Sequence, residues 1–294
     1  NLNDYPIDSN KPSIMLVHGR KGSANDWPTT EIGFALKNRL DTSQYNILAW
    51  DWKDAADFET YLYEDLAMLY SNAIMQGNKL ATELINTNLI NKDLHLIGHS
   101  AGGVVINETA GVVKKLVDDT VEHLTFLDPL DPGDTLNGNN AIWSDSYYSG
   151  LLDYRWPPST IIGGPIKNAY NQDLSEYHFG DHNYPIYWYE GTTLNDASEE
   201  GFFWSKEGDG WNQKPPPNYS GSIIKSLMTE TFSAIGNWIS SGNVYFLQGM
   251  GFLKEASSAY LFEEISLPED VNYLSFNFKF TELGDGDYLK LYFD

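Results

Sequence analysis

The residues best suited to chemistry stand together in one short stretch, Gly98-His99-Ser100-Ala101-Gly102. A G-x-S-x-G frame alone is weak evidence, since about one chain in ten of this length contains one by chance. Here an apolar run ends at Gly98 and an apolar pattern of helical period begins just after the frame, which places Ser100 on a tight turn between a strand and a helix. Such a turn strains the backbone and exposes the hydroxyl. We expect a nucleophile elbow rather than an ordinary glycine-rich turn.

A serine hydroxyl becomes a nucleophile only when a histidine takes its proton and an acid orients that histidine. On a strand-turn-helix elbow the three residues follow the chain order serine, acid, histidine. Asp128 follows the next apolar strand and is the candidate acid, with Asp131 and Asp134 as competitors and a capping role as the alternative. Only His178 and His182 come later in the chain, and we favour His182, which precedes an apolar-aromatic segment.

Two backbone N–H groups are candidates for an oxyanion hole. One belongs to Ala101, directly after the nucleophile, and the other to Arg20, in the loop that follows the apolar strand 13–17. The alternative for this loop is a plain strand-to-helix connection. We assign His18 and His99 to structural turns.

Strands alternate with helices along the first half of the chain, so we expect an α/β fold with a mainly parallel sheet. Ligands of such sheets bind at the carboxyl ends of the strands, where Ser100, Asp128 and the loop after residue 17 fall. The predicted strands are 13–17, 45–52, 93–98 and 121–127, with weaker ones at 159–162 and 166–170. The predicted helices are 31–40, 55–87 with an interruption at Gly77, 101–117 and 220–240.

Long aromatic loops flank the predicted site, at 131–177 and 191–219. Loops of this length in a compact domain are usually functional. We therefore predict that Trp143, Trp156, Phe203 and Trp204 line the substrate pocket or form a lid. The alternative is that these rings only pack the loops against the sheet.

The pattern changes after residue 240 to short alternating strands. We expect a catalytic domain over 1–240 and, over 241–294, the start of an appended β-sandwich that is incomplete here and that could bind a surface or polymer partner. The turn from Asp285 to Asp287 carries two carboxylates that could hold a structural calcium ion, but a solvated turn is the favoured interpretation. We expect no other metal and no cofactor.

Composition narrows the class of partner. With 41 acidic and 18 basic residues, a net charge of -23 repels phosphate backbones and excludes a nucleic-acid partner. The chain has no cysteine, which excludes a thiol nucleophile, thiolate metal sites and disulfides. We find no transmembrane segment and no signal peptide, and the initial Asn1 suggests a processed or excised piece.

The sequence resembles the pancreatic-type lipases and their phospholipase A1 relatives, in four blocks spread over about residues 13 to 190. These are Val17-His18-Gly19, Asp51-Trp52-Lys53, His95 to Gly102, and Leu127 to Pro132. The resemblance implies an α/β-hydrolase with Ser100 as nucleophile, Asp128 as acid and His182 as base. It also implies a mobile lid and, often, a C-terminal β-sandwich. The family's disulfides are absent, and we expect a secreted bacterial member.

The leading hypothesis is a secreted serine carboxylic-ester hydrolase, lipase-like, which acts on a neutral ester through an acyl-serine intermediate. One alternative is an esterase of acylated polysaccharide or another polymer, because the loops are rich in Trp and Tyr. Another is a non-catalytic binding or structural protein on a lipase fold.

Overall fold

A computed structural model gives the fold of most of the chain. It describes residues 1–2, 5–57, 63–91, 93–117, 119–131, 135–149, 161–178 and 181–220, together with the short strands β9 (Ile239–Ser241), β10 (Val244–Leu247), β11 (Met250–Leu253) and β12 (Tyr260–Phe262).

Six strands form one sheet in the order β2-β1-β3-β4-β6-β8, and every neighbouring pair is parallel. Their bounds are β1 Ser13–Val17, β2 Asn46–Trp50, β3 Leu94–His99, β4 Val121–Leu127, β6 Ala141–Tyr148 and β8 Tyr170–Asp173. A small antiparallel pair, β5 (Leu130–Asp131) with β7 (Ile161–Ile162), follows β4. The parallel sheet confirms the expected fold class.

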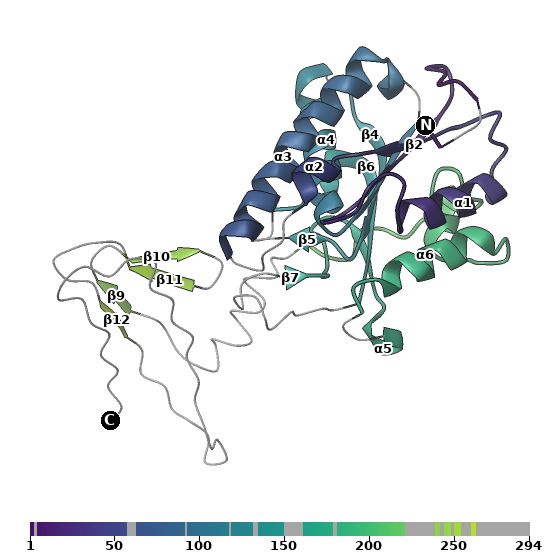
Figure 1. Cartoon of the computed structure of the whole chain (residues 1–294). Helices are drawn as coiled ribbons and strands as arrows, with labels where there is room; N and C mark the ends of the chain where they lie inside the picture. The colour runs from purple at the N-terminus through teal and green to yellow at the C-terminus, as the bar shows by residue number, and fades with distance from the viewer. Residues whose placement is uncertain are drawn as a thin grey trace.

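Helices cover both faces of this sheet (Figure 1). The helices α2 (Lys53–Ala56), α3 (Tyr63–Asn86) and α4 (Ala101–Val117) lie on one face, and α1 (Thr29–Arg39) and α6 (Tyr184–Leu194) lie on the other. Shorter turns are α5 (Ser175–His178), η1 (Leu89–Asn91), η2 (Gly138–Asn140), η3 (Gly201–Trp204) and η4 (Trp211–Gln213). No helix of the described residues is both long and apolar enough to cross a membrane.

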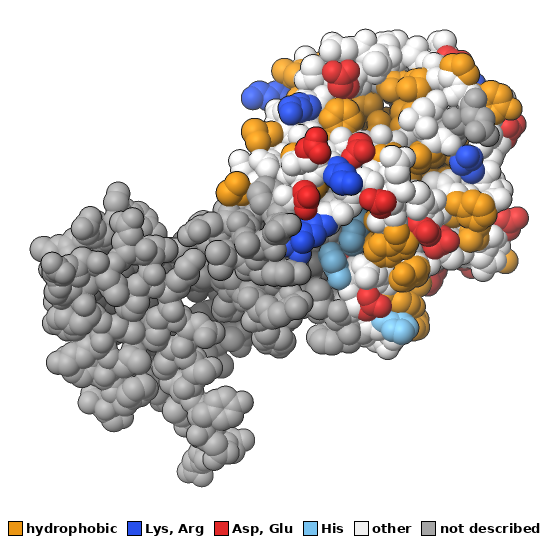
Figure 2. Space-filling model, viewed as in Figure 1, with side chains coloured by type: hydrophobic (Ala, Val, Ile, Leu, Met, Phe, Trp, Pro, Cys, Tyr) orange, Lys and Arg blue, Asp and Glu red, His pale blue; other side chains and the backbone are white. Residues whose placement is uncertain are grey.

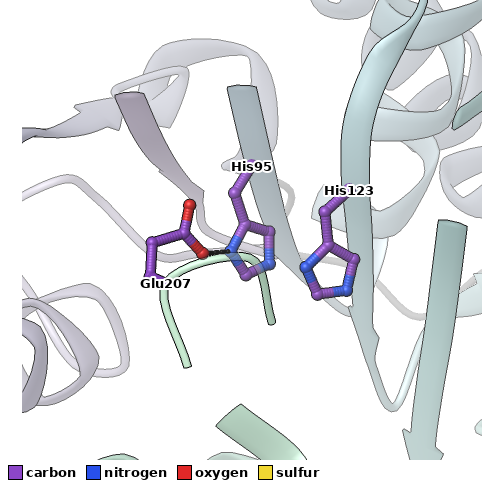
Figure 3. A group of neighbouring side chains, drawn as sticks. All are labelled: His95, His123 and Glu207. Carbon is purple, nitrogen blue, oxygen red and sulfur yellow. Dashed lines mark hydrogen bonds and ion pairs between the residues drawn. The ribbon is translucent and has the colours of Figure 1, made fainter. Parts of the chain in front are cut away.

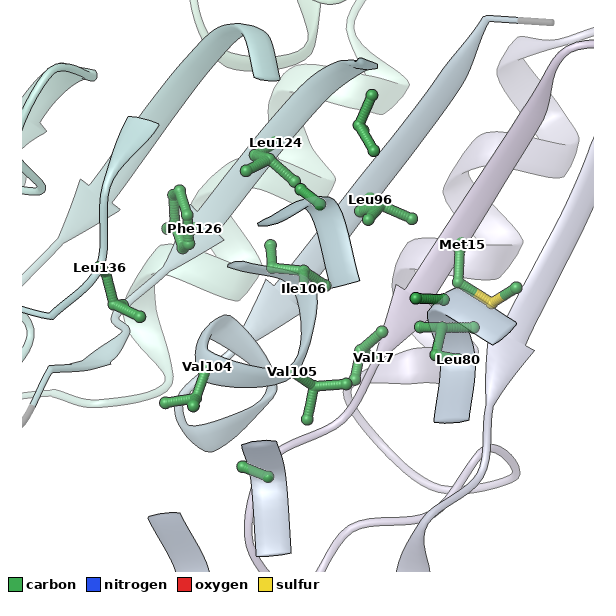
Figure 4. Packing of buried hydrophobic residues seen from close by; sticks show 14 of the residues in the cluster. Met15, Val17, Leu80, Leu96, Val104, Val105, Ile106, Leu124, Phe126 and Leu136 are labelled. Atoms are coloured by element: carbon green, nitrogen blue, oxygen red, sulfur yellow. The ribbon is translucent and has the colours of Figure 1, made fainter. Parts of the chain in front are cut away.

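The strands are apolar on both faces because both are covered. On one face, Leu96 and Leu124 pack with Leu80 of α3 and Val105 of α4 in the larger core cluster (Figure 4). Alternate strand residues point the other way, where Ile97 and Leu127 join side chains of α1 and α6: Ile32, Leu36, Ile186 and Tyr189. Packing on each face removes apolar surface from water. Each Å² removed contributes roughly 25 cal/mol of favourable free energy, which stabilises the three layers.

The predicted interruption of the long helix at Gly77 is wrong, because α3 continues through that residue. A side chain at Gly77 would place its Cβ 2.6 Å from Cβ of Glu108 on α4. The glycine therefore allows two helices to cross closely, and the hydroxyl of Thr109 donates to its carbonyl over 3.2 Å.

Among the elements that the sequence patterns missed, β6 and α6 matter most for the site. The aromatic loop 131–177 contains β6, an eight-residue strand between β4 and β8 in the sheet, and α6 begins at Tyr184, soon after His182. The predicted strand 166–170 is displaced, since β8 starts at Tyr170. Of the predicted helix 220–240, residues 221–238 lie outside the described residues, and its last two residues instead begin β9. Most of the predicted sandwich and the turn at Asp285 to Asp287 also lie outside them.

The start of α4 should tolerate no added methyl group. In a Gly102→Ala variant the new Cβ would stand 2.3 Å from the carbonyl oxygen of Val17, whereas the Cβ in Gly111→Ala, on the same helix, would meet Asn140 at an ordinary 3.5 Å. We expect the first change to lower the free energy of unfolding by about 1–3 kcal/mol. The second should be neutral or stabilising by up to about 1 kcal/mol. Urea unfolding of both variants measures this, and equal effects would contradict it.

Candidate active site

Ser100 occupies the turn between β3 and α4 with a left-handed backbone, φ 56°. Two glycines make this turn possible. The Cβ of a residue at Gly98 would stand 2.5 Å from the carbonyl oxygen of Gly102, and Gly102 itself lies against the end of β1. A serine held in this unfavourable conformation by its surroundings is typical of a functional residue. The predicted elbow geometry is present.

Asp128 follows β4, the strand beside β3, and is fully buried. Its Oδ1 accepts hydrogen bonds from the backbone N–H of Ser149 over 2.8 Å and from the Ser149 hydroxyl over 3.3 Å. Gly163, at φ +74°, passes so close that a Cβ there would lie 2.3 Å from Oδ1. The carboxylate is thus fixed on one side by Ser149, and its second oxygen remains for another partner.

That partner is His182, whose Nδ1–H donates to Oδ2 of Asp128 over 2.5 Å. A carboxylate on Nδ1 holds the imidazole in the tautomer that leaves Nε2 ready to accept a proton. The His182 side chain is 27% exposed, while the carboxylate is buried, so the base faces the surface and the acid lies beneath it. The structure brings together the acid and the base that the sequence suggested.

His99 contributes a contact that the sequence did not reveal. Its Nε2–H donates to the backbone carbonyl of His182 over 3.1 Å, and the two rings lie 4.6 Å apart between centroids. Burial, with the neighbouring His182, holds the pKa of His99 well below its ordinary value, so its ring is neutral. The residue before the nucleophile therefore fixes the loop that carries the base. The Ser100 hydroxyl makes no hydrogen bond to His182 within the described residues, a contact that apo structures often lack.

The loop after β1 is clamped beside the nucleophile. His18 donates through Nδ1 to the Gly19 carbonyl and accepts through Nε2 from the backbone N–H of Trp52, while the Trp52 indole donates to the His18 carbonyl over 2.7 Å. Burial lowers the pKa of His18, as this neutral tautomer requires. His18 thus has the structural role predicted for it.

This clamp presses the backbone of Gly19 against Ser100. A Cβ on Gly19 would stand 2.8 Å from the Cβ of the serine. Arg20 follows directly in the turn, and Ala101 is the first residue of α4, where a helix leaves its N–H groups unpaired within the helix. Both candidate oxyanion donors therefore flank the nucleophile.

A small apolar pocket opens beside these residues at the carboxyl ends of β1, β3 and β4. Its lining is formed by Leu16, Val17, Pro28, Thr29, Ile32, Ile97, His99 and Leu127. Trp27 stands next to it, with its ring 6.3 Å from that of His99 and 5.4 Å from that of Tyr187. Tyr187 is 52% exposed, and Figure 2 shows histidine side chains at the surface beside hydrophobic ones on the face in view.

The structure does not bring Trp143, Phe203 or Trp204, the described residues of the predicted lid, to Ser100. Trp143 lies within β6, 5% exposed, and packs on His123. Phe203 and Trp204 lie in η3, which packs against α6, and the chain three residues later contacts the start of β3 rather than its end. Trp156 lies outside the described residues.

The competing acid and base candidates have other positions. Asp131 is buried and caps its own loop, since its Oδ1 accepts from the backbone N–H and hydroxyl of Thr135. Asp134 lies outside the described residues. His178 is exposed at the end of α5, with its ring 4.4 Å from that of Tyr184.

Comparisons with known proteins found similar solved structures but no family. No protein-family model and no curated protein matches the sequence. Similar solved structures include a lipase of Bacillus licheniformis in propeptide form (15% identity, TM-score 0.35, 62% of this chain and 48% of that one). Another is a thioesterase from the prodiginine pathway of Streptomyces coelicolor (15% identity, TM-score 0.30, 47% of this chain and 46% of that one). A third is a phospholipase of Legionella pneumophila (13% identity, TM-score 0.29, 50% of this chain and 39% of that one).

These identities and TM-scores are too low to show an activity. The parallel sheet, the elbow after β3 and the helices on both faces define the fold as that of an α/β-hydrolase.

Gly163 gives a sharp test of the acid's position. Gly163→Ala would force an L-residue to φ +74° and drive its methyl group into the Asp128 carboxylate, whereas a Cβ on Gly191, within α6, would meet nothing within 4 Å. We expect Gly163→Ala to lower kcat/KM on a soluble ester by about 10²-fold or more, because small misplacements of catalytic groups cost that much. Gly191→Ala should keep activity and stability. Full activity in the first variant would contradict this account of the site.

Proposed function

We propose that this protein is a serine carboxylic-ester hydrolase that acts through an acyl-Ser100 intermediate. The observation that carries the proposal is the hydrogen bond of 2.5 Å between His182 and the buried Asp128, in a loop whose backbone bonds to His99, the residue before the left-handed Ser100. A buried carboxylate, a partly exposed imidazole and an elbow serine are the parts that nucleophilic acyl transfer needs.

In this mechanism Nε2 of His182 accepts the proton of the Ser100 hydroxyl as the oxygen attacks the ester carbonyl. The Asp128 carboxylate stabilises the imidazolium that forms, through Nδ1. The backbone N–H groups of Ala101 and Arg20 stabilise the tetrahedral oxyanion. His182 then gives the proton to the leaving alcohol, and a water molecule, activated in the same way, releases the acid and restores the serine.

We further propose a lipid-like ester as the substrate. The small pocket beside His99 is lined mainly by apolar side chains, and near it the exposed ring of Tyr187 packs on Trp27, so this face favours an apolar substrate. A secreted bacterial protein related to the pancreatic-type lipases remains our hypothesis for the whole chain, on the strength of the four sequence blocks.

The nucleophile can be tested directly. Ser100→Ala should lower ester turnover by about 10³-fold or more and abolish covalent labelling by an organophosphonate, detected as a mass increase of the intact protein. Ser149→Ala removes a hydroxyl that touches only the acid and the Asp181 carbonyl, so labelling should persist. Folded wild-type protein that takes no label would favour a non-catalytic binding protein.

Chain-length profiling tests the substrate class. We expect kcat/KM for p-nitrophenyl esters to rise from acetyl to medium-chain acyl groups, because each buried methylene adds about 0.8 kcal/mol of favourable transfer free energy. Ile97→Ser, which places a hydroxyl in the pocket lining, should reduce this rise and leave the acetyl ester less affected. A preference of the wild-type protein for acetyl esters would instead support an esterase of decorated polymers.

A further inference from the structure

A second cluster of titratable side chains lies at the opposite end of β3 from Ser100. His95 and His123 are register partners on β3 and β4, and their rings stack with centroids 3.9 Å apart. Glu207, from the loop after η3, reaches across with Oε2 3.0 Å from Nδ1 of His95. Figure 3 shows the ring of His95 between the Glu207 carboxyl and the ring of His123. All three side chains are at most 1% exposed.

The Nε2 atoms of both rings already have partners. Nε2 of His123 donates to Oδ1 of Asp145 over 3.0 Å, and Nε2 of His95 lies 2.8 Å from the Thr125 hydroxyl. Asp145 also accepts from the Tyr147 hydroxyl over 2.8 Å. Histidines that bind metals show this pattern, in which one ring nitrogen bonds to a carboxylate or hydroxyl and the other faces the metal.

Two other atoms of the cluster lack such partners. Nδ1 of His123 and Oε1 of Glu207 are buried and have no hydrogen-bond partner within the described residues. Because Nε2 of His123 carries the proton that it donates to Asp145, Nδ1 of the same ring is left as an acceptor, and Figure 3 shows it on the side that faces His95. A buried acceptor without a donor costs roughly 1–3 kcal/mol, and a cation bound at Nδ1 of His123 would satisfy that atom.

The cluster also holds two buried carboxyl groups. That of Glu207 contacts the ring of His95, and that of Asp145 contacts the ring of His123. The nearby Lys206 pairs instead with Glu122 and Asp93. A divalent cation would bring positive charge to these carboxyl groups.

We propose that His95, His123 and Glu207 bind a divalent transition-metal ion, zinc by its donor set, which ties the loop after η3 to the starts of β3 and β4. The candidate ligand atoms of the three residues lie within 4.8 Å of one another. Zinc with bonds of about 2.0–2.1 Å holds its ligand atoms about 3.4 Å apart, so binding would draw the more distant of these atoms closer together than they lie in the structure. His95 then binds through Nδ1 and carries its proton on Nε2, toward Thr125.

The metal content of the protein tests this site. Protein stripped with a chelator, mixed with ZnCl2 and passed through gel filtration should retain one zinc per chain by elemental analysis. Its Tm should rise, while CaCl2 and MgCl2, ions that prefer oxygen ligands, should raise it little. Co²⁺ should give the visible absorption of a tetrahedral site. Wild-type protein that retains less than about a tenth of an equivalent of zinc per chain would overturn the proposal.

Variants locate the bound ion. Glu207→Gln and His123→Gln should weaken zinc binding at least tenfold, while His178→Gln, at an exposed histidine of α5, should keep it. His182→Gln detects zinc held at the catalytic pair instead. Retention in Glu207→Gln and His123→Gln, or loss in His182→Gln, would overturn the assignment to this cluster. Glu207→Gln should keep its turnover of a soluble ester, because the cluster lies at the far end of β3 from Ser100.

Discussion

The close approach of the start of α4 to the end of β1 is the constraint on which the site depends. The backbone of Gly102 lies against the carbonyls of Val17 and His18, and Gly19 lies against Ser100. Only residues without a Cβ permit these contacts. The same contacts set the conformation of the serine and bring the loop of the first strand to its side, so one packing arrangement positions the proposed nucleophile and the candidate oxyanion donors.

A second constraint is the burial of Asp128. A carboxylate that is fully buried is stable only when its oxygens accept hydrogen bonds. Ser149 and His182 supply them, and each comes from a different part of the chain. These hydrogen bonds therefore join the end of β6 to the loop before α6, so that folding of the acid's surroundings also places the base.

The elbow and Asp128 could be predicted because both follow apolar strands whose patterns are local. β6 could not, because Ser144, Asp145 and Ser146 read as a polar loop. In the structure these residues are buried, and partners from distant segments satisfy them: the Asp145 carboxylate bonds His123 and Tyr147, and the Ser144 hydroxyl donates to the Gly138 carbonyl. For the same reason the aromatic segment with Phe203 looked like a lid, since no local pattern tells which end of the sheet a long connection reaches.

The pairing of His99 with the loop of His182 has a consequence for how the site handles charge. Two imidazoles with centroids 4.6 Å apart repel each other when both are protonated, and His99 uses its one N–H to hold a carbonyl. Its burial keeps it neutral, so in the proposed acyl transfer His182 is the histidine that takes the proton. His99 therefore adds rigidity to the site without adding a second ionisation.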